Sequence, residues 1–321
     1  MNKSRLKEAV IAVTYRCNSR CRMCDIWKIS DHEGELTVED YEKIPENLTD
    51  INISGGEPFL RKELSQIIEV ISRRCSKANI TISTNAFATE LTTKKMEEIL
   101  RIVPNVGVVI SIDGVGKEHS VIRGIDKGFE KAMDTLNNLR EIGVKSLKFG
   151  FTIGDYNFNE LKKVYNLAKE KNVELSFTLV HSSDNYFGKE NKISKKDEMV
   201  GAIDWLIEKE LSFWKPMKWG RAFYAHGMKQ FLLTGVRILP DYSGQLGVFI
   251  NPQGEIFPCD VSSKKMGTLQ EIDKVEFNSH TGECEKSWMM CTARQSIKKH
   301  IVRVLFWVFI NKIKLHLKKL F

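Results

Sequence analysis

The sequence predicts an α/β protein with a mainly parallel sheet, and two observations lead to that prediction. From residue 8 to about residue 211, short β-branched runs alternate with stretches of helical periodicity, which is typical of βα units around a parallel sheet. After residue 211 the alternation stops, so a smaller region follows. A chain of 321 residues also exceeds one average domain. We therefore expect regions at 1–211, 212–296 and 297–321.

The first region is expected to contain strands and helices in strict alternation. The strands are predicted at 10–14, 50–54, 79–83, 106–112, 146–152 and 173–180. The helices are predicted at 38–46, 61–75, 92–102, 127–142, 159–171 and 195–211. In the second region, residues 247–259 are typical of a hairpin that turns at 252–254.

The net charge of +8 belongs mostly to the end of the chain. Seven Lys and Arg and no Asp or Glu lie between 297 and 321, so the rest of the chain is nearly neutral. This distribution argues against a broad nucleic-acid-binding face. The charged start of the chain contains no signal-peptide hydrophobic segment, so we expect a cytoplasmic protein with reduced thiols. Its seven Cys then indicate metal ligands more than a disulfide framework.

Three of these cysteines follow the first predicted strand. Cys17, Cys21 and Cys24 have the spacing C-x3-C-x2-C, and three thiolates on one loop can hold three irons of a cubane cluster and leave the fourth iron open. The alternative is a structural zinc site, in which His32 or a distant Cys completes four ligands. That alternative implies a zinc-stabilised, membrane-associated interaction protein without catalysis.

This cysteine motif resembles the signature of the radical S-adenosylmethionine (radical SAM) superfamily. The resemblance implies a partial (β/α)6 TIM-like barrel with its site at the carboxyl ends of the strands. It also implies a 4Fe-4S cluster whose open iron is chelated by SAM, which is cleaved reductively to a 5′-deoxyadenosyl radical. The residue before the last Cys is usually aromatic in this family, and here it is Met23.

The ends of the next three predicted strands carry small and polar residues that continue the likeness. The resemblance implies SAM binding by the Gly-Gly-Glu-Pro segment after the second strand and by polar groups after the third and fourth. Arg123, in an Ile-Arg-Gly segment, is the implied partner of the SAM carboxylate; the alternative is a solvated loop arginine. The candidate cofactor-binding residues are Gly55, Gly56, Glu57, Ser83, Asn85, Ser111, Asp113 and Arg123.

The second region resembles the SPASM and twitch extensions of this family, which hold auxiliary iron-sulfur clusters. Its candidate ligands are Cys259, Cys284 and Cys291, while Ser287 stands where a further Cys is common. Either an auxiliary cluster has an open or non-cysteine ligand, or the cluster has been lost and the fold survives. Cys75 is expected to be a buried apolar residue. Candidate substrate contacts follow the sixth strand at His181, Ser182, Ser183 and Asp184.

The last region contains an apolar segment at 301–310 that is flanked by basic residues. A membrane-spanning helix needs about 20 residues, so two placements remain: a helix in an anionic membrane interface, or a helix docked on the barrel. We expect a radical SAM enzyme that receives electrons from a small protein such as flavodoxin or ferredoxin. Its substrate is a peptide or protein, or a carbohydrate or lipid, and the sequence does not separate these classes.

Overall fold

The computed structural model describes residues 5–30, 32–183, 186, 188–277 and 284–318. Its centre is one nine-stranded sheet with the strand order β6-β5-β4-β3-β2-β1-β7-β8-β9. The first six strands are parallel to their neighbours in the sheet, so their carboxyl ends share one edge. The strands are β1 (Glu8–Ala12), β2 (Asp50–Ser54), β3 (Asn79–Thr84), β4 (Gly107–Ser111), β5 (Ser146–Ile153), β6 (Glu174–Leu179), β7 (Gly247–Ile250), β8 (Glu255–Phe257) and β9 (Gly267–Thr268).

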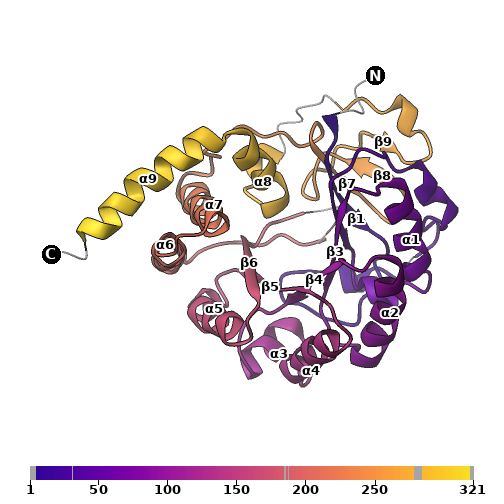
Figure 1. The fold of residues 1–321 in the computed structure, drawn as a ribbon, viewed down its shortest axis with the longest axis horizontal. Helices are drawn as coiled ribbons and strands as arrows, with labels where there is room; N and C mark the ends of the chain where they lie inside the picture. The colour runs from indigo at the N-terminus through magenta and orange to yellow at the C-terminus, as the bar shows by residue number, and fades with distance from the viewer. Residues whose placement is uncertain (1–4, 31, 184–185, 187, 278–283, 319–321) are drawn as a thin grey trace.

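The helices between these strands form an outer arc around the sheet (Figure 1). They are α1 (Leu64–Arg74), α2 (Thr89–Ile102), α3 (Lys117–Arg123), α4 (Gly128–Glu141), α5 (Leu161–Glu170) and α6 (Lys196–Leu211). Three more follow in the later regions: α7 (Pro216–Thr234), α8 (Met290–Lys299) and α9 (Ile301–Leu317). The predicted partial (β/α)6 barrel is confirmed by this arrangement.

Alternating burial explains how the strands position the site. Along β5 and β6 every second residue is fully buried, because it faces the apolar stripe of the outer helices. The intervening residues are half-buried and face the opposite side of the sheet. Polar residues gather on that inner side, among them Asn52, Ser83, Ser111, Thr152 and Thr178.

The structure corrects one predicted helix and adds others. Residues 38–46 do not form an α-helix but a short 3-10 helix, Glu39–Lys43. Ile44 ends it, because the following Pro45 disfavours helical backbone in the residue before it. Helices α3, α7 and α8 were not predicted from the sequence; α3 and α7 show why. The first is short, and the second is apolar on several sides because α6 and α9 both pack on it, so it shows little amphipathic periodicity.

The extension is joined to the barrel at the sheet. Strand β7 pairs in parallel with β1, and the predicted hairpin is confirmed, since β7 pairs antiparallel with β8. Gly254 closes the turn with a φ of +80°, which glycine adopts readily. On the far side, Arg294 and Lys298 of α8 both form ion pairs with Glu8 of β1, at 2.8 and 2.9 Å.

The tail forms the single long helix α9, which projects from the body beside α7 (Figure 1). Val304 and Val308 are buried against the body, and Trp307 packs edge-on against Phe223 of α7. None of the described helices combines the length and the apolarity needed to cross a membrane.

Candidate active site

The cysteine loop lies at the carboxyl end of β1, as predicted. Cys17, Cys21 and Cys24 are half-buried, and the loop turns back through a hydrogen bond from the Cys24 amide to the Cys21 carbonyl at 3.2 Å. Burial raises the pKa of Cys17 to about 12 and that of Cys24 to about 11. Both thiols are therefore protonated at neutral pH in metal-free protein, and each must release its proton to ligate a metal.

The Gly-Gly turn after β2 lies directly against this loop. The Gly56 amide donates to the Thr14 carbonyl and the Glu57 amide to the Arg16 carbonyl, both at 2.8 Å. A Cβ atom at Gly55 would lie 2.2 Å from the Thr14 carbonyl oxygen, and one at Gly56 would lie 2.3 Å from the Arg16 carbonyl oxygen. The glycines therefore allow two backbone segments to touch, which the sequence analysis did not anticipate.

Glu57 joins the second and third strand ends. Its buried carboxylate accepts hydrogen bonds from the Thr84 hydroxyl at 2.9 Å, the Asn85 amide at 2.7 Å and the Phe59 amide at 3.2 Å. Burial raises the pKa of Glu57 to about 7, and these three donors act in the opposite direction. With its oxygens occupied in this way, Glu57 is a positioning residue for the strand ends.

Asn85 then connects the third strand end to the cysteine loop. Its side-chain amide donates to Asn18 Oδ1 at 2.8 Å and lies 3.8 Å from Cys17 Sγ. The hydroxyl of Ser83 donates to Asn52 Oδ1 at 2.9 Å, and Ser111 lies half-buried at the end of β4. Three of the predicted strand-end residues are thus brought to one side of the sheet.

Arg123 is the cation at this site. Its Nη2 forms an ion pair with Asp113 Oδ2 at 2.6 Å, and its Nη1 lies 3.5 Å from Cys21 Sγ. Burial opposes the charge on Arg123, but Asp113 and Cys21 raise its pKa above the usual arginine range, so it remains cationic. This rules out the solvated loop arginine. The Asp113 backbone amide donates to His119 Nδ1 at 3.1 Å, which fixes the turn that carries the aspartate.

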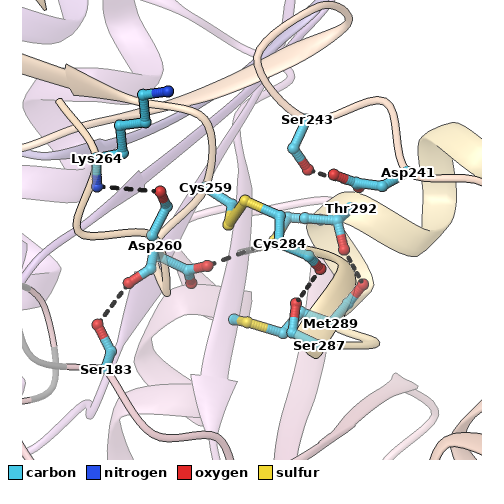
Figure 2. The surroundings of a disulfide bond; sticks show 12 residues. Ser183, Asp241, Ser243, Cys259, Asp260, Lys264, Cys284, Ser287, Met289 and Thr292 are labelled. Carbon is cyan, nitrogen blue, oxygen red and sulfur yellow. Dashed lines mark hydrogen bonds between the residues drawn. A yellow bond between two sulfur atoms is a disulfide. The ribbon is translucent and has the colours of Figure 1, made fainter. Parts of the chain in front are cut away.

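The cysteines of the extension differ from the expected three free thiols. Cys259 and Cys284 form a disulfide (Figure 2), because the end of the hairpin and the 3-10 turn Cys284–Lys286 bring the two sulfurs together. Cys291 is free, and its Sγ lies 4.0 Å from Asp260 Oδ1. Ser287 does not take the place of a ligand, since its hydroxyl donates to the Cys284 carbonyl at 3.0 Å.

Asp260 is the residue of this cluster that the sequence analysis missed. It follows Cys259 in the chain and is buried, and no Lys or Arg of the described residues forms an ion pair with its carboxylate. Burial raises the pKa of Asp260 to about 7. A buried carboxylate beside a free thiol is a further candidate ligand for a metal centre.

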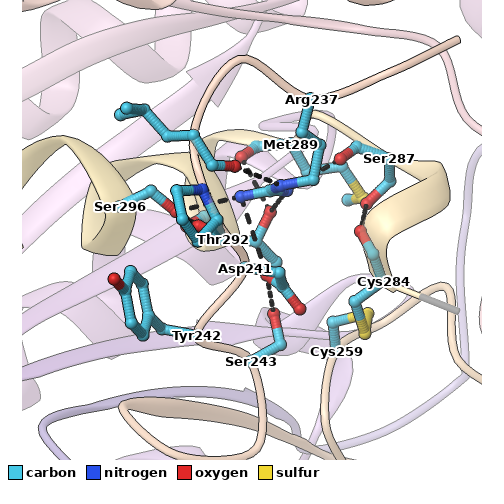
Figure 3. Close-up of polar contacts among 12 residues, drawn as sticks. Arg237, Asp241, Tyr242, Ser243, Cys259, Cys284, Ser287, Met289, Thr292 and Ser296 are labelled. Atoms are coloured by element: carbon cyan, nitrogen blue, oxygen red, sulfur yellow. Dashed lines mark hydrogen bonds and ion pairs between the residues drawn. A yellow bond between two sulfur atoms is a disulfide. The ribbon is translucent and has the colours of Figure 1, made fainter. Parts of the chain in front are cut away.

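A network centred on Arg237 holds the segment that contains the later cysteines (Figure 3). Its guanidinium donates to the Ser287 carbonyl at 2.7 Å and to the hydroxyls of Thr292 and Ser296, both at 3.0 Å. The same group lies 4.9 Å from the ring centroid of the buried Trp288. These contacts fix both ends of the turn between Cys284 and Cys291.

The comparison with known families decides what this site belongs to. Residues 11–168, which contain the cysteine loop, the Gly-Gly turn and Arg123, match the radical SAM superfamily. This chain belongs to the radical SAM superfamily. Its relatives include two named enzymes, Fe-coproporphyrin III synthase and GTP 3',8-cyclase.

Individual relatives of this radical SAM protein are distant. It is 28% identical over 220 residues to Fe-coproporphyrin III synthase of Methanosarcina barkeri, covering 65% of this chain and 52% of the relative. It is 24% identical over 282 residues to the sporulation killing factor maturation protein SkfB of Bacillus subtilis, covering 84% of this chain and 64% of the relative. The chain thus spans only about half to two thirds of the length of these relatives.

Among solved structures, the radical SAM protein is similar to Streptococcus suis SuiB bound to S-adenosylmethionine. The TM-score is 0.61 at 17% identity, and the match covers 83% of this chain and 64% of SuiB. At this identity the likeness shows the shared fold, which agrees with the sheet and helix order described above.

The donor set of the radical SAM site fits the cofactors of its family. Three thiols lie on one loop, and the amide of Asn85 and the guanidinium of Arg123 border two of their sulfurs. Within the described residues, no three His, Cys, Asp or Glu side chains converge on a position for a single metal ion. The zinc-site alternative therefore gains no support, whereas a cubane cluster spreads its ligands over several irons.

The structure also shows residues near the radical SAM site that the sequence analysis missed. Tyr156 packs beside Cys21 and Met23, and its buried hydroxyl has no hydrogen-bond partner within the described part of the chain. Tyr186 reaches the Gly-Gly turn, where its hydroxyl lies 2.9 Å from Ser54 Oγ and donates to the Gly55 carbonyl at 3.1 Å. In the sequence, the one signal that could have indicated Tyr156 and Tyr186 as site residues is that they follow the ends of β5 and β6. Met23, at the position that is usually aromatic in this family, packs with Ile122 and Val180.

The predicted substrate residues after β6 are partly described. Burial lowers the pKa of His181 to about 4, so this side chain is neutral at pH 7. Ser182 donates to the Asn191 carbonyl at 3.4 Å, and Ser183 donates to the Asp260 carbonyl at 2.6 Å. Asp184 lies outside the described residues.

Proposed function

We propose that Cys17, Cys21 and Cys24 hold a 4Fe-4S cluster and that SAM binds beside it at the carboxyl ends of β2 to β4. The observation that carries the proposal is the contact of Arg123 with Cys21 Sγ at 3.5 Å, in a loop whose sequence matches the family. Once bound and reduced by one electron, the cluster would supply the electron that cleaves SAM to methionine and a 5′-deoxyadenosyl radical, which would take a hydrogen atom from a substrate. The protein binds and orients the reactants and excludes water.

The chain's own residues divide these tasks. Arg123 binds the SAM carboxylate through its guanidinium, and Asp113 holds that guanidinium in place through the ion pair. Gly55 and Gly56 keep the backbone of the turn against the cysteine loop, and the Gly56 carbonyl accepts from the SAM amine. Glu57 and Asn85 position the strand ends, while Ser83 and Ser111 offer hydroxyls to the nucleoside.

We further propose an auxiliary iron-sulfur cluster in the extension, with Cys259, Cys284 and Cys291 as ligands. The disulfide supports the convergence of two of them, but these two thiols must be reduced before they ligate iron. The reduction takes two electrons and two protons from a dithiol and yields two cysteine thiols.

The substrate that we propose is a peptide or protein. The relative SkfB is named as the maturation protein of a sporulation killing factor, and SuiB has been solved with a precursor peptide. These names favour that class over carbohydrates and lipids. We also propose that a flavodoxin or ferredoxin supplies the electron, and that the enzyme works in the cytoplasm with peripheral contact at the inner face of the membrane.

The test is anaerobic SAM cleavage after reconstitution with iron and sulfide. The dithionite-reduced protein should release 5′-deoxyadenosine, measured by liquid chromatography and mass spectrometry. Replacement of Cys17, Cys21 and Cys24 by Ala should abolish the release and lower the absorbance near 400 nm to that of the auxiliary cluster alone. The matched control is Cys75→Ala, because Cys75 is buried in the hydrophobic core and its thiol donates to the Pro45 carbonyl at 3.3 Å. Wild-type cleavage by the triple variant would refute the proposal.

A further inference from the structure

Helix α9 has an unusual outer face. On its inner face, Val304 and Val308 are buried against the rest of the protein. The opposite face carries Val302, Phe306 and Phe309, whose exposed fractions are 78%, 66% and 64%, followed by Ile313 at 45%. Their spacing places them in one row along the helix. A surface helix normally has polar residues there, so this row indicates a surface that a partner covers.

Two more exposed apolar residues lie on the elements that neighbour α9. Trp214, in the connection between α6 and α7, is 82% exposed, and Met217, at the start of α7, is 64% exposed. The Lys312 ammonium lies 4.1 Å from the Trp214 ring centroid and donates to the Leu211 carbonyl at 2.7 Å. Trp214 is therefore held beside α9.

The charge around this row identifies its partner. Arg303, Lys314 and Lys318 are exposed on α9 or at its end, and residues 297–321 contain no Asp or Glu. One acidic neighbour is Glu208 of α6, which pairs with Lys318 at 3.0 Å. An apolar row flanked by cations, with an exposed Trp at its edge, matches the chemistry of an anionic lipid surface.

We propose that α9 lies in the plane of an anionic membrane, with Val302, Phe306 and Phe309 buried among the acyl chains and the flanking cations at the headgroups. The helix spans 17 residues, or roughly 25 Å at 1.5 Å per residue, and its inner face is already packed on the protein. It therefore lies on the bilayer and does not cross it. This inference rests on the peripheral contact in the proposed function, but it is independent of SAM cleavage.

The experiment is vesicle co-sedimentation of the full chain. One set of vesicles contains phosphatidylglycerol and phosphatidylcholine in equal amounts, and the other contains phosphatidylcholine alone. The protein should bind the anionic vesicles at least about tenfold more tightly, and added salt should weaken that binding. Phe306→Ser combined with Phe309→Ser should reduce the binding at least about tenfold. The control is Val121→Ser, which also replaces an exposed apolar residue by Ser but lies in α3, where Val121 is 61% exposed.

Three results would overturn the inference. The first is equal binding of both vesicle types, and the second is unchanged binding by the Phe306 and Phe309 variant. The third is a concentration-dependent dimer that the same variant abolishes, without vesicle binding, which would assign the face to a second copy of the chain. Circular dichroism and SAM cleavage of each variant show that it is folded. A variant that cleaves SAM but loses vesicle binding separates this inference from the radical chemistry.

Discussion

Asp260 is buried, although burial of a carboxylate without a paired cation is normally unfavourable. It lies beside the free thiol of Cys291, and no described cation pairs with it. Asp241 provides a comparison in the same region, since it is equally buried but lies 3.6 Å from the Arg237 guanidinium and accepts from Ser243 at 2.8 Å. The two aspartates therefore differ in whether a described cation pairs with them.

This difference gives a prediction for the auxiliary site. In a chain with Ala at 17, 21 and 24, anaerobic reconstitution should still load about four irons. Adding Asp260→Ala should lower the iron content to about three and produce the electron paramagnetic resonance signal of a three-iron cluster. Adding Asp241→Asn should change neither quantity. An Asp260 variant with unchanged iron content and spectrum would show that this carboxylate is not a ligand.

His119 makes stability depend on pH. Burial lowers its pKa to about 3 from 6.5, so the folded protein prefers the neutral ring. The stabilisation is complete above pH 6.5 and is lost as the pH falls toward 3, by at most about 1.4 kcal/mol per pH unit.

His119→Asn tests this prediction in the metal-free protein. Asn keeps an acceptor for the Asp113 amide but loses the ring contacts with Phe87 and Phe129. The variant should therefore be less stable at pH 7, and the difference should narrow by pH 5. Urea denaturation at both pH values measures it. Parallel curves for the two proteins would contradict the assigned pKa shift.

At the scale of the elements, the turn after β2 and the cysteine loop act as one unit because their backbones touch. Gly56→Ala should force them apart, since its Cβ would lie 2.3 Å from the Arg16 carbonyl oxygen. We expect a loss of about 1–3 kcal/mol in the free energy of unfolding and at least about tenfold slower SAM cleavage.

Gly201→Ala is the matched control for this substitution. Gly201 lies in α6, and a Cβ atom at this position would have no neighbouring atom within 4 Å, so Ala should stabilise the helix by about 0.5–1 kcal/mol. Its SAM cleavage should equal that of the parent. If Gly56→Ala cleaves SAM at the parent rate, the contact is not needed for activity.

The sequence predicted those elements in which the pattern of apolar and polar residues matches the buried and exposed sides of the folded element. The alternation of β5 and β6 gave their places, because one side faces helices and the other faces the site. Helix α7 was missed because contacts on several sides remove the periodic signal. The Cys259–Cys284 pairing was missed because it depends on how the hairpin and the 3-10 turn meet in space. The ion pair of Arg123 with Asp113 also needs tertiary structure, although its residues were identified.

At the scale of the whole molecule, the barrel and the extension share one sheet. β1 pairs with β2 on one side and with β7 on the other, and Glu8 ties the same strand to α8. Each region therefore contributes to the burial of the other. We expect them to unfold in one cooperative transition.

Phe249→Ala tests this coupling. Phe249 of β7 is fully buried and contacts Tyr186 and Phe257, so its truncation should cost about 3–5 kcal/mol. Hydrogen exchange in β3 and β4 should accelerate together with exchange in β7 and β8. Faster exchange confined to the hairpin would mean that the extension unfolds by itself.

One short segment after β6 reaches both cysteine-bearing sites. Ser183 donates to the Asp260 carbonyl next to Cys259, and Tyr186 donates to the Gly55 carbonyl in the turn behind the cysteine loop. A molecule that docks where these two side chains sit must break either bond or fit between them. Its arrival would therefore act on a segment that contacts both the turn behind the cysteine loop and the chain next to Cys259.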